Sequence, residues 1–446
     1  MAQRFADSDE LYTFLLGFVN VERGQKTVFK LDRMRYLCES LGDPQGAYRT
    51  IHVAGSKGKG SVSAMIARAL QASGRRVGLY TSPHLLRWKE RMSLAGDEMP
   101  EEIVLAAAAE VLPLMEGKGP TDFPGGELPT YFELTTLIAF CAFRLAGCDS
   151  AVVETGLGGR LDSTNVLPSE ASVITPIELE HTEWLGDTIP LIAAEKAGIV
   201  KPGKPCFLSR QRDEAREVFA RTCADRGSPL REAPVLARAG EVSIGPGGTT
   251  ARISFAPSSP MGARFPGGIG ARTPMIGAIQ AENMALALLA AGETEASLGP
   301  EEAARGLARA FLPARFQILS RAPPVILDGA HTPASIGLAL ESLETLFPGP
   351  KALLFACAED KRHKEMAAAL APKFERITLT RPGAFKRGDL ATLASSFVEA
   401  GASFRATEDH VEAIARAREE AAALGLPLLV TGSFYLCSAF AESFPA

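Results

Sequence analysis

The stretch RTIHVAGSKGKGS, residues 49 to 61, places Lys59 between Gly58 and Gly60 and ends on Ser61. Glycines let backbone N–H groups close around phosphate oxygens, and a helix that begins here adds the positive end of its dipole. Lys59 could then reach the β- and γ-phosphates of a nucleotide, and Ser61 could hold Mg²⁺. The stretch therefore predicts a phosphate-binding loop.

The spacing of this loop departs from the general pattern G-x-x-x-x-G-K-[ST]. Gly55 lies only three residues before Gly58, and Gly60 separates Lys59 from Ser61. The alternative is a glycine-rich turn without a ligand. A lysine inside a tight turn gains nothing from packing, which favours the phosphate-binding interpretation.

Two further polar residues follow strand-like runs. Glu154 ends the apolar run Ala151–Val153, and His181 follows the next such run. An acidic residue at a strand end beside a phosphate loop is a common ligand for Mg²⁺ or water. The alternatives are a solvated carboxylate for Glu154 and a surface loop position for His181.

Lys196 occupies an apolar helical face. Ile189, Ile192 and Ala193 recur at helical spacing with it, so a lysine stands where an apolar residue is expected. Its stem could pack while its ammonium group reaches water. Alternatively, burial lowers its pKa, and the neutral amine adds CO₂ to form a carbamate, an oxygen ligand for Mg²⁺.

A second group of polar residues lies in the last third of the chain. Asp328 and His331, in the run DGAH, follow a strand-like segment, and Arg315 precedes it. The arginine could meet phosphoryl charge and the aspartate could bind a hydroxyl or amine of a nucleotide held by the first domain. A simple Asp-Gly turn and a surface arginine are the alternatives.

Alternating strand and helix patterns must position these residues. The strand candidates, each followed by a polar or glycine-rich turn, are 51–54, 77–81, 151–154, 171–177, 325–327, 352–355, 377–380 and 428–431. Helical candidates are 134–145, 189–200, 280–291, 301–311 and 335–347. The pattern favours an α/β fold with two domains, 1–311 and 312–446, joined by a hinge at Leu312-Pro313. Residues 240–277, rich in Gly, Pro and Ser, predict a small antiparallel excursion or a long loop.

Composition narrows the class of protein. The chain has 446 residues, a net charge of −5 and seven scattered cysteines without a C-x-x-C pair. We expect no general affinity for nucleic acid, no membrane span, no zinc site and reduced thiols in a cytoplasmic protein. The N-terminus shows no apolar signal-peptide core.

Taken in order, the motifs resemble folylpolyglutamate synthase and its bifunctional relative with dihydrofolate synthase activity, within the Mur ligase superfamily. The resemblance covers nearly the whole chain. Its motifs are the segment from Leu31-Asp32-Arg33-Met34 through Leu41-Gly42, VAGSKGKGS, TSPHLLRWKERM, TYFELTT, VVETGLGGRLDSTN, the His181 segment, EKAGIVKPG, Gln280-x-x-Asn283, PARFQ, DGAH and VTGSFYL.

The resemblance implies a P-loop-type, mostly parallel N-terminal domain with an ATP and folate site, and a smaller Rossmann-like C-terminal domain for glutamate ligation. It implies catalytic roles for Lys59, Lys196 and His331. The implied ATP site consists of Gly58, Lys59, Gly60, Ser61, Asn283, Arg315 and Asp328. The implied ligands of two Mg²⁺ sites are Ser61, Ser82, Glu154, His181 and carbamylated Lys196. Implied folate contacts are Leu31, Asp32, Arg33, Tyr131, Phe132 and Glu133, and implied glutamate contacts are Arg91, His331 and Ser433.

The implied reaction is ATP-dependent amide formation by a monomer. A folate γ-carboxylate, or the carboxylate of dihydropteroate, attacks the γ-phosphate to give an acyl phosphate, which the α-amine of L-glutamate then opens. Closure of the domains about the hinge would exclude water from the acyl phosphate. One position departs from the family pattern, since Thr332 follows the DGAH histidine where asparagine is common.

Two other functions remain open at this point. A Mur-type ligase of cell-wall precursors would share the phosphate loop and the metal-site lysine, although TYFE and the N-terminal segment argue against it. A non-catalytic ATP-binding switch protein would leave Lys196, Arg91 and the DGAH run without a role.

Overall fold

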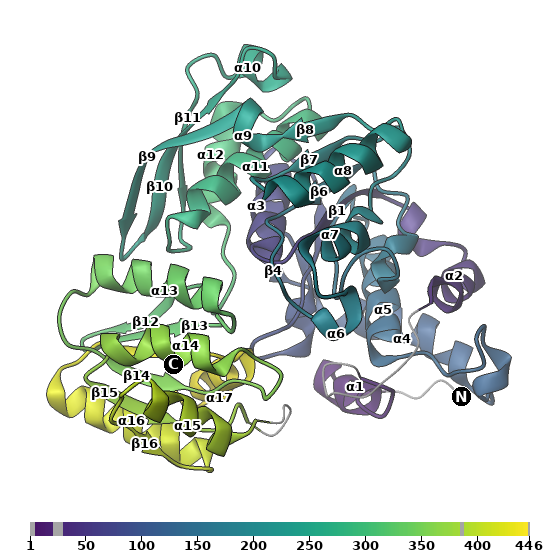
Figure 1. The fold of residues 1–446 in the computed structure, drawn as a ribbon. Helices are drawn as coiled ribbons and strands as arrows, with labels where there is room; N and C mark the ends of the chain where they lie inside the picture. The colour runs from purple at the N-terminus through teal and green to yellow at the C-terminus, as the bar shows by residue number, and fades with distance from the viewer. Residues whose placement is uncertain (1–4, 21–29, 384–387, 445–446) are drawn as a thin grey trace. The chain divides into compact units, whose positions relative to one another are not determined.

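The computed structural model describes residues 5–20, 30–383 and 388–444. The chain forms two compact units (Figure 1). The first consists of residues 1–241, 251–273 and 281–311, and the second of residues 242–250, 274–280 and 312–446. None of the helices in the described residues is long and apolar enough to cross a membrane.

An eight-stranded sheet forms the centre of the first unit. Its strands, in spatial order, are β4 (Asp97–Glu98), β3 (Met92–Leu94), β2 (Val77–Tyr80), β5 (Ser150–Glu154), β1 (Arg49–Ala54), β6 (Ala171–Ile174), β7 (Cys206–Leu208) and β8 (Leu230–Glu232). The neighbouring strands β2, β5, β1, β6, β7 and β8 run parallel to one another. Strands β3 and β4 extend the sheet at one edge and pair antiparallel. Burial of five of the six β1 residues explains its nearly continuous apolar run.

Helices cover this sheet. Those that begin before Leu312 are α1 (Ser8–Leu15), α2 (Leu31–Ser40), α3 (Lys59–Ala72), α4 (Glu101–Val111), α5 (Tyr131–Leu145), α6 (Thr182–Leu185), α7 (Ile189–Ala197), α8 (Asp213–Asp225), α9 (Ala233–Leu236), α10 (Pro260–Arg264), α11 (Ile279–Thr294) and α12 (Pro300–Arg309). Helix α5 packs on Ala151 and Val153 of β5 in one apolar core, and α7 packs on β6 and β7 in another. These cores hold the strands whose ends carry the candidate site.

The glycine-rich region 240–277 contains regular structure. A three-stranded sheet has the order β11 (Ile269–Thr273), β10 (Gly248–Phe255) and β9 (Ala237–Gly245). Only two residues join β9 to β10, a connection that antiparallel strands allow. The predicted excursion is therefore a small sheet.

The second unit has a six-stranded sheet. Its order is β12 (Gln317–Arg321), β13 (Pro324–Asp328), β17 (Leu428–Thr431), β14 (Ala352–Phe355), β15 (Arg376–Leu379) and β16 (Arg405–Ala406). Only β12 is antiparallel to its neighbour. Helices α13 (Pro333–Leu346), α14 (His363–Leu370) and α15 (Leu390–Glu399) share one apolar core with the sheet. Helices α16 (His410–Leu424) and α17 (Phe434–Ser443) contact β13, β14, β15 and β17.

The predicted α/β class is confirmed, and all eight predicted strands and five predicted helices are present, most with shifted ends. Among the strands the largest shift is in β6, which ends at Ile174, whereas the sequence predicts a strand to Ile177. Thr175 hydrogen-bonds through its backbone N–H to the Ala54 carbonyl, and the chain then turns at Pro176. The apolar sequence pattern therefore extends beyond the last residue that pairs within the sheet.

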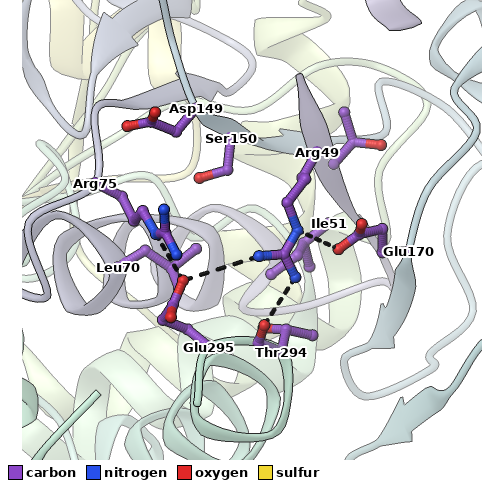
Figure 2. A pocket seen from close by; sticks show the side chains of 10 residues that line it. Arg49, Ile51, Leu70, Arg75, Asp149, Ser150, Glu170, Thr294 and Glu295 are labelled. Carbon is purple, nitrogen blue, oxygen red and sulfur yellow. Dashed lines mark hydrogen bonds and ion pairs between the residues drawn. The ribbon is translucent and has the colours of Figure 1, made fainter. Parts of the chain in front are cut away.

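An ionic clasp closes the amino ends of β1 and β5, and it lines the pocket drawn in Figure 2. Glu295, which is 5% exposed, accepts a 2.7 Å bond from Arg75 Nε and lies 3.9 Å from Arg49. Arg49 also donates to the Thr294 carbonyl at 2.9 Å and to Glu170 at 2.6 Å. The clasp therefore fixes the carboxyl end of α11 to the sheet, at the edge opposite the glycine loop.

Candidate active site

The candidate site lies at the carboxyl edge of the first sheet. Strands β1, β2, β5 and β6 end here at similar levels, with Val53 beside Glu154 and Tyr80 beside Val153. The segments that follow the four strands therefore meet, as is usual for sites in open α/β sheets.

Two glycines shape the loop between β1 and α3. Gly55 has φ 145°, and a Cβ there would lie 1.9 Å from Thr175 Oγ1. Gly58, with φ 82°, is the N-cap of α3, and a Cβ there would lie 3.0 Å from Asn283 Oδ1. Both positions therefore exclude other residues, and Asn283, an expected ATP-site residue, lies against the loop.

The lysine cluster, which we define as Lys57, Lys59, Lys196 and Glu180, lies beside the carbonyl oxygen of Gly55. Lys59 Nζ donates to that oxygen at 2.9 Å, and Lys196 Nζ donates to it at 2.8 Å. Lys196 also pairs with Glu180 at 3.0 Å, and Lys57 lies 3.9 Å from the same carboxylate. Two residues predicted to be catalytic thus share one backbone acceptor beside the start of α3.

Burial and charge act in opposite directions within this cluster. Lys196 is 1% exposed, and burial lowers its pKa to about 8, although the Glu180 carboxylate opposes the shift. Burial alone would raise the pKa of Glu180, but the charges of Lys196, Lys59 and Lys57 outweigh it and hold that pKa below its usual range. Lys196 therefore has a larger neutral fraction near pH 7 than a lysine in water.

A buried carboxylate closes the glycine-rich segment that follows Glu154. Asp162 accepts a 2.7 Å bond from the Leu157 backbone N–H and a second bond from the Thr164 hydroxyl. His52 of β1 lies 2.7 Å from that hydroxyl through Nε2, and burial lowers the histidine pKa well below its usual range. A neutral His52 therefore donates to Thr164, which donates to Asp162.

The same segment packs directly on α7. A Cβ at Gly159 would lie 2.8 Å from the Glu195 carbonyl oxygen and 3.0 Å from the Lys196 Cα atom. Arg160 donates its backbone N–H to that carbonyl at 2.7 Å and pairs with the Glu195 carboxylate at 2.8 Å. These contacts fix the backbone of Lys196 relative to β5.

Apart from Lys196, the expected metal ligands are three residues with side-chain oxygen atoms and one histidine. Glu154 is 3% exposed and accepts the Ser82 backbone N–H at 3.2 Å, so these two residues come together. Ser61 is buried in the first turn of α3, and His181 is exposed at the N-cap of α6 with φ 49°. A left-handed backbone at a residue other than glycine often marks a functional position.

These donors suit Mg²⁺ better than a softer metal. Carboxylate and hydroxyl oxygens are hard ligands, and no three His, Cys, Asp or Glu side chains form a metal-binding group within the described residues. An ammonium group at Lys196 would repel a cation, whereas a carbamate would bind one. The donor set therefore fits Mg²⁺ on condition that Lys196 is modified.

Two of the residues expected to contact folate bind each other. Arg33 of α2 pairs with Glu133 of α5 at 2.8 Å, and both residues are 3% exposed. Glu133 also accepts the backbone N–H of Thr130 at 2.7 Å. This buried pair joins α2 to α5.

The other expected folate residues differ in exposure. Leu31 is buried at the start of α2, and Asp32 is exposed and pairs with Arg35 at 3.2 Å. Tyr131 is 1% exposed, whereas Phe132 is half-buried and packs so closely on the glycine segment that a Cβ at Gly156 would lie 2.3 Å from its ring. Phe132 is therefore the member of this group closest to the catalytic edge.

Arg91, expected on the glutamate side, lies in an aromatic cluster. It is 1% exposed, donates from Nε to His84 Nδ1 at 2.8 Å and has its guanidinium 5.5 Å from the Tyr131 ring centroid. Burial, together with the arginine charge, lowers the pKa of His84 to about 3. Tyr12 of α1 packs edge-on against His84 at 5.3 Å. His84 is therefore neutral and orients Arg91.

In the second unit, Asp328 holds the PARFQ segment. Its carboxylate accepts the Phe316 backbone N–H at 2.8 Å and the Ala330 N–H at 2.8 Å. Ala314 and Phe316, on either side of Arg315, both have left-handed backbones, with φ 52° and 47°. Arg315 thus projects from a constrained turn.

His331 and Ser433 lie on loops at the carboxyl edge of the second sheet. His331 Nδ1 lies 2.8 Å from the Gly329 carbonyl, which can only accept, so Nδ1 carries the donated proton. Ser433 is the N-cap of α17 and accepts the Tyr435 N–H at 3.1 Å. Thr332 is the N-cap of α13 and accepts the Ser335 backbone N–H at 3.3 Å, at a position that asparagine also favours.

Sequence reasoning missed three residues of these sites. Glu180 lies in the polar run that precedes His181, but only the fold shows that it faces Lys196. His84 is within TSPHLLRWKERM without a role of its own, and Phe434 is within VTGSFYL. The two motifs contain these residues, but only the fold shows that His84 contacts Arg91 and that Phe434 contacts Arg315.

Comparisons with known proteins identify the family of this chain. The family model described as Mur ligase, glutamate ligase domain, matches residues 314–434. The chain is 33% identical to the folylpolyglutamate synthase of Lacticaseibacillus casei over 417 residues, covering 92% of this chain and 93% of that protein. It spans about half the length of two haloarchaeal relatives described as probable bifunctional folylpolyglutamate synthase/dihydropteroate synthase.

Solved structures show the same likeness over nearly the whole chain. Mycobacterium tuberculosis folylpolyglutamate synthase complexed with ADP has a TM-score of 0.87 at 28% identity, covering 98% of both chains. A structure described as an FPGS–AMPPCP–folate complex has a TM-score of 0.81 at 29% identity, again covering 98% of both chains. These likenesses, with a Bacillus subtilis dihydrofolate synthase/folylpolyglutamate synthase that is 34% identical over 76% of this chain and 78% of that protein, show that the chain belongs to the folylpolyglutamate synthase/dihydrofolate synthase family of Mur-type, ATP-dependent ligases.

Proposed function

We propose that this protein ligates L-glutamate to folates with consumption of ATP, and that it also accepts dihydropteroate. The observation that carries the proposal is the lysine cluster beside the start of α3, where Lys59 and buried Lys196 share the Gly55 carbonyl. The folylpolyglutamate synthase relative and the likeness to a complex of FPGS with AMPPCP and folate support ATP and folates as substrates, and relatives described as dihydrofolate synthase/folylpolyglutamate synthase support dihydropteroate.

The reaction that we propose has two steps. A folate γ-carboxylate, or the dihydropteroate carboxylate, attacks the γ-phosphorus of ATP and releases ADP, which gives an acyl phosphate. The α-amine of glutamate then attacks the acyl carbon, loses a proton and expels phosphate. Lys59 and the N–H groups at the start of α3 neutralise the phosphoryl charge, because such transfers depend on positioning and electrostatics.

Lys196 supplies an anion in this proposal. Its neutral amine adds CO₂ and releases a proton, which converts a buried cation into a carbamate. Glu154, Ser61, Ser82, His181 and this carbamate are the proposed ligands for two Mg²⁺ ions. Bound Mg²⁺ would neutralise the charge that develops on the phosphate oxygens.

The second unit supplies Arg315 and Asp328 for the nucleotide and His331 and Ser433 for glutamate in this proposal. Nε2 of His331 is the proposed acceptor of the proton that the attacking amine loses. Arg91 is proposed to bind a glutamate carboxylate. The folate contacts remain proposals, and Phe132 is the strongest because it borders the glycine segment.

We further propose that the protein works as a monomer in the cytoplasm. Each of its seven cysteines is a buried free thiol, as expected in a reducing compartment.

The test is substrate-dependent phosphate release. The purified protein is given ATP, Mg²⁺ and glutamate with tetrahydrofolate, with dihydropteroate or with a muramyl peptide precursor, and the ligated product is identified by mass. We expect release and product formation with both pterin substrates. Turnover with the muramyl substrate alone, or ATP binding without turnover, would overturn the proposal.

A further inference from the structure

The ring of Phe434 lies between two of the proposed functional side chains in the second unit. The Arg315 guanidinium carbon lies 4.6 Å from the ring centroid, within cation–π range. The His331 ring also packs against the Phe434 ring, with 6.3 Å between the ring centroids and 61° between the ring planes. A Cβ at Gly329 would lie 2.6 Å from the Phe434 ring, so the glycine of DGAH allows the aromatic ring to approach.

The backbone beneath Arg315 is already constrained. Ala314 and Phe316 adopt left-handed conformations that residues other than glycine seldom occupy. Hydrogen bonds hold them there, from Ala314 N–H to Gln317 Oε1 at 3.1 Å and from Phe316 N–H to Asp328 Oδ2 at 2.8 Å. Such strain is maintained where the surrounding contacts over-determine the backbone, and it concentrates at functional sites.

A fixed backbone does not by itself fix the long arginine side chain, whose Nη1 also donates to the Ala314 carbonyl at 3.3 Å. Stacking on Phe434 restricts the rotamers of Arg315, and this contact uses the face of the planar guanidinium group. The N–H donors of the guanidinium group lie in its plane. An anion can therefore be met edge-on while the face stays on the ring. Leucine at this position would fill similar space without a π face.

We propose that Phe434 is a positioning residue, which stacks Arg315 in the orientation that meets the phosphates of the nucleotide. This inference rests on the nucleotide role proposed above for Arg315. His331 keeps its own bond to the Gly329 carbonyl, so its orientation depends less on the ring.

The test measures affinity for AMPPCP with Mg²⁺ by titration calorimetry, in the full-length protein, so that it does not depend on ligation. We expect Phe434→Leu to weaken binding about three- to tenfold, as loss of one cation–π contact predicts, and Phe434→Tyr to restore it. The matched control is Phe404→Leu, because Phe404 is also half-buried against an aromatic ring of this unit, Phe397 at 6.2 Å, and should leave affinity unchanged.

A double-mutant cycle separates positioning from general packing. In an Arg315→Ala background, Phe434→Leu should cause no further loss of affinity, because the side chain that it orients is gone. Equal losses in both backgrounds, or unchanged affinity in Phe434→Leu, would overturn the inference. A wild-type protein that binds AMPPCP but forms no glutamate product would refute the proposed ligation, while the cycle would still decide the role of Phe434.

Discussion

Replacement of Lys196 by alanine is the most informative single change in this protein. The side chain is 1% exposed, and burial lowers its pKa to about 8, from an ordinary value of 10.5. At pH 7 an amine with a pKa of about 8 is neutral in about one molecule in ten, against about one in three thousand at 10.5. The fold thus raises the neutral, CO₂-reactive fraction of Lys196 above that of a lysine in water.

Because the carbamate is proposed as a metal-site group, we expect Lys196→Ala to lose more than about 100-fold in ligation rate. Short carboxylates such as formate or acetate should restore part of the loss by entering the space that the side chain leaves. The sign of the pH dependence follows from the lowered pKa. Carbamate formation in the wild type should rise between about pH 6 and pH 8, as the ammonium form is depleted, and ¹³C NMR with ¹³CO₂ would measure it.

Lys201 provides a matched control for this experiment. Burial, with the charges of Arg226 and Arg35, also lowers its pKa to about 8, but its ammonium group donates to Asn165 at 2.8 Å, away from the glycine loop. We expect Lys201→Met to keep its ligation activity and to show no response to added carboxylates. Full ligation activity in Lys196→Ala without added carboxylate would refute the carbamate role. Equal losses of activity in Lys196→Ala and Lys201→Met would mean that the loss follows from removal of any buried lysine.

Three smaller perturbations test the remaining parts of the site and fold. Lys59→Ala should abolish ligation and leave the far-UV circular dichroism and melting temperature nearly unchanged, since this loop substitution removes little packing; wild-type turnover would refute the phosphate-loop assignment. Thr332→Ala should lower the free energy of unfolding by about 1 kcal/mol, whereas Thr332→Asn should restore it in urea titrations, and equal effects of the two would argue against capping. Glu295→Gln should lower stability by about 1–2 kcal/mol at pH 7, after allowance for the half-exposed arginines. Its pKa is lowered to about 2, so this stability is present above about pH 5 and is lost as the pH falls toward 2; a difference from the wild type that stays constant between pH 6 and pH 3 would contradict it.

The sequence predicted the central elements because their signals are local. Five of the six residues of β1 are buried, so a nearly continuous apolar run gives the strand, and the glycines that follow give the turn. In the two larger sheets, the short strands β3, β4, β7, β8, β12 and β16 escaped prediction. All of these except β12 have only two or three residues, too few to produce a periodic pattern.

The site could be predicted as a set of segments, but the side-chain pairings could not. Arg33 and Glu133 are separated by 100 positions, and nothing in either helix indicates that they satisfy each other. Glu180 is one of three acidic or basic groups in a polar run, and its role depends on the approach of α7 to β6. Such contacts arise from the packing of distant elements, which local patterns do not encode.

Helix α11 acts as a strut across the first sheet. Its 16 residues extend about 24 Å. Asn283, near one end, touches the phosphate loop at Gly58, and the other end is tied by the carbonyl of Thr294 and by the adjoining Glu295 to Arg49 and Arg75. One helix therefore connects the glycine loop at one edge of the sheet to an ion-pair cluster around buried Glu295 at the opposite edge, so the loop and the amino ends of the strands share one rigid support.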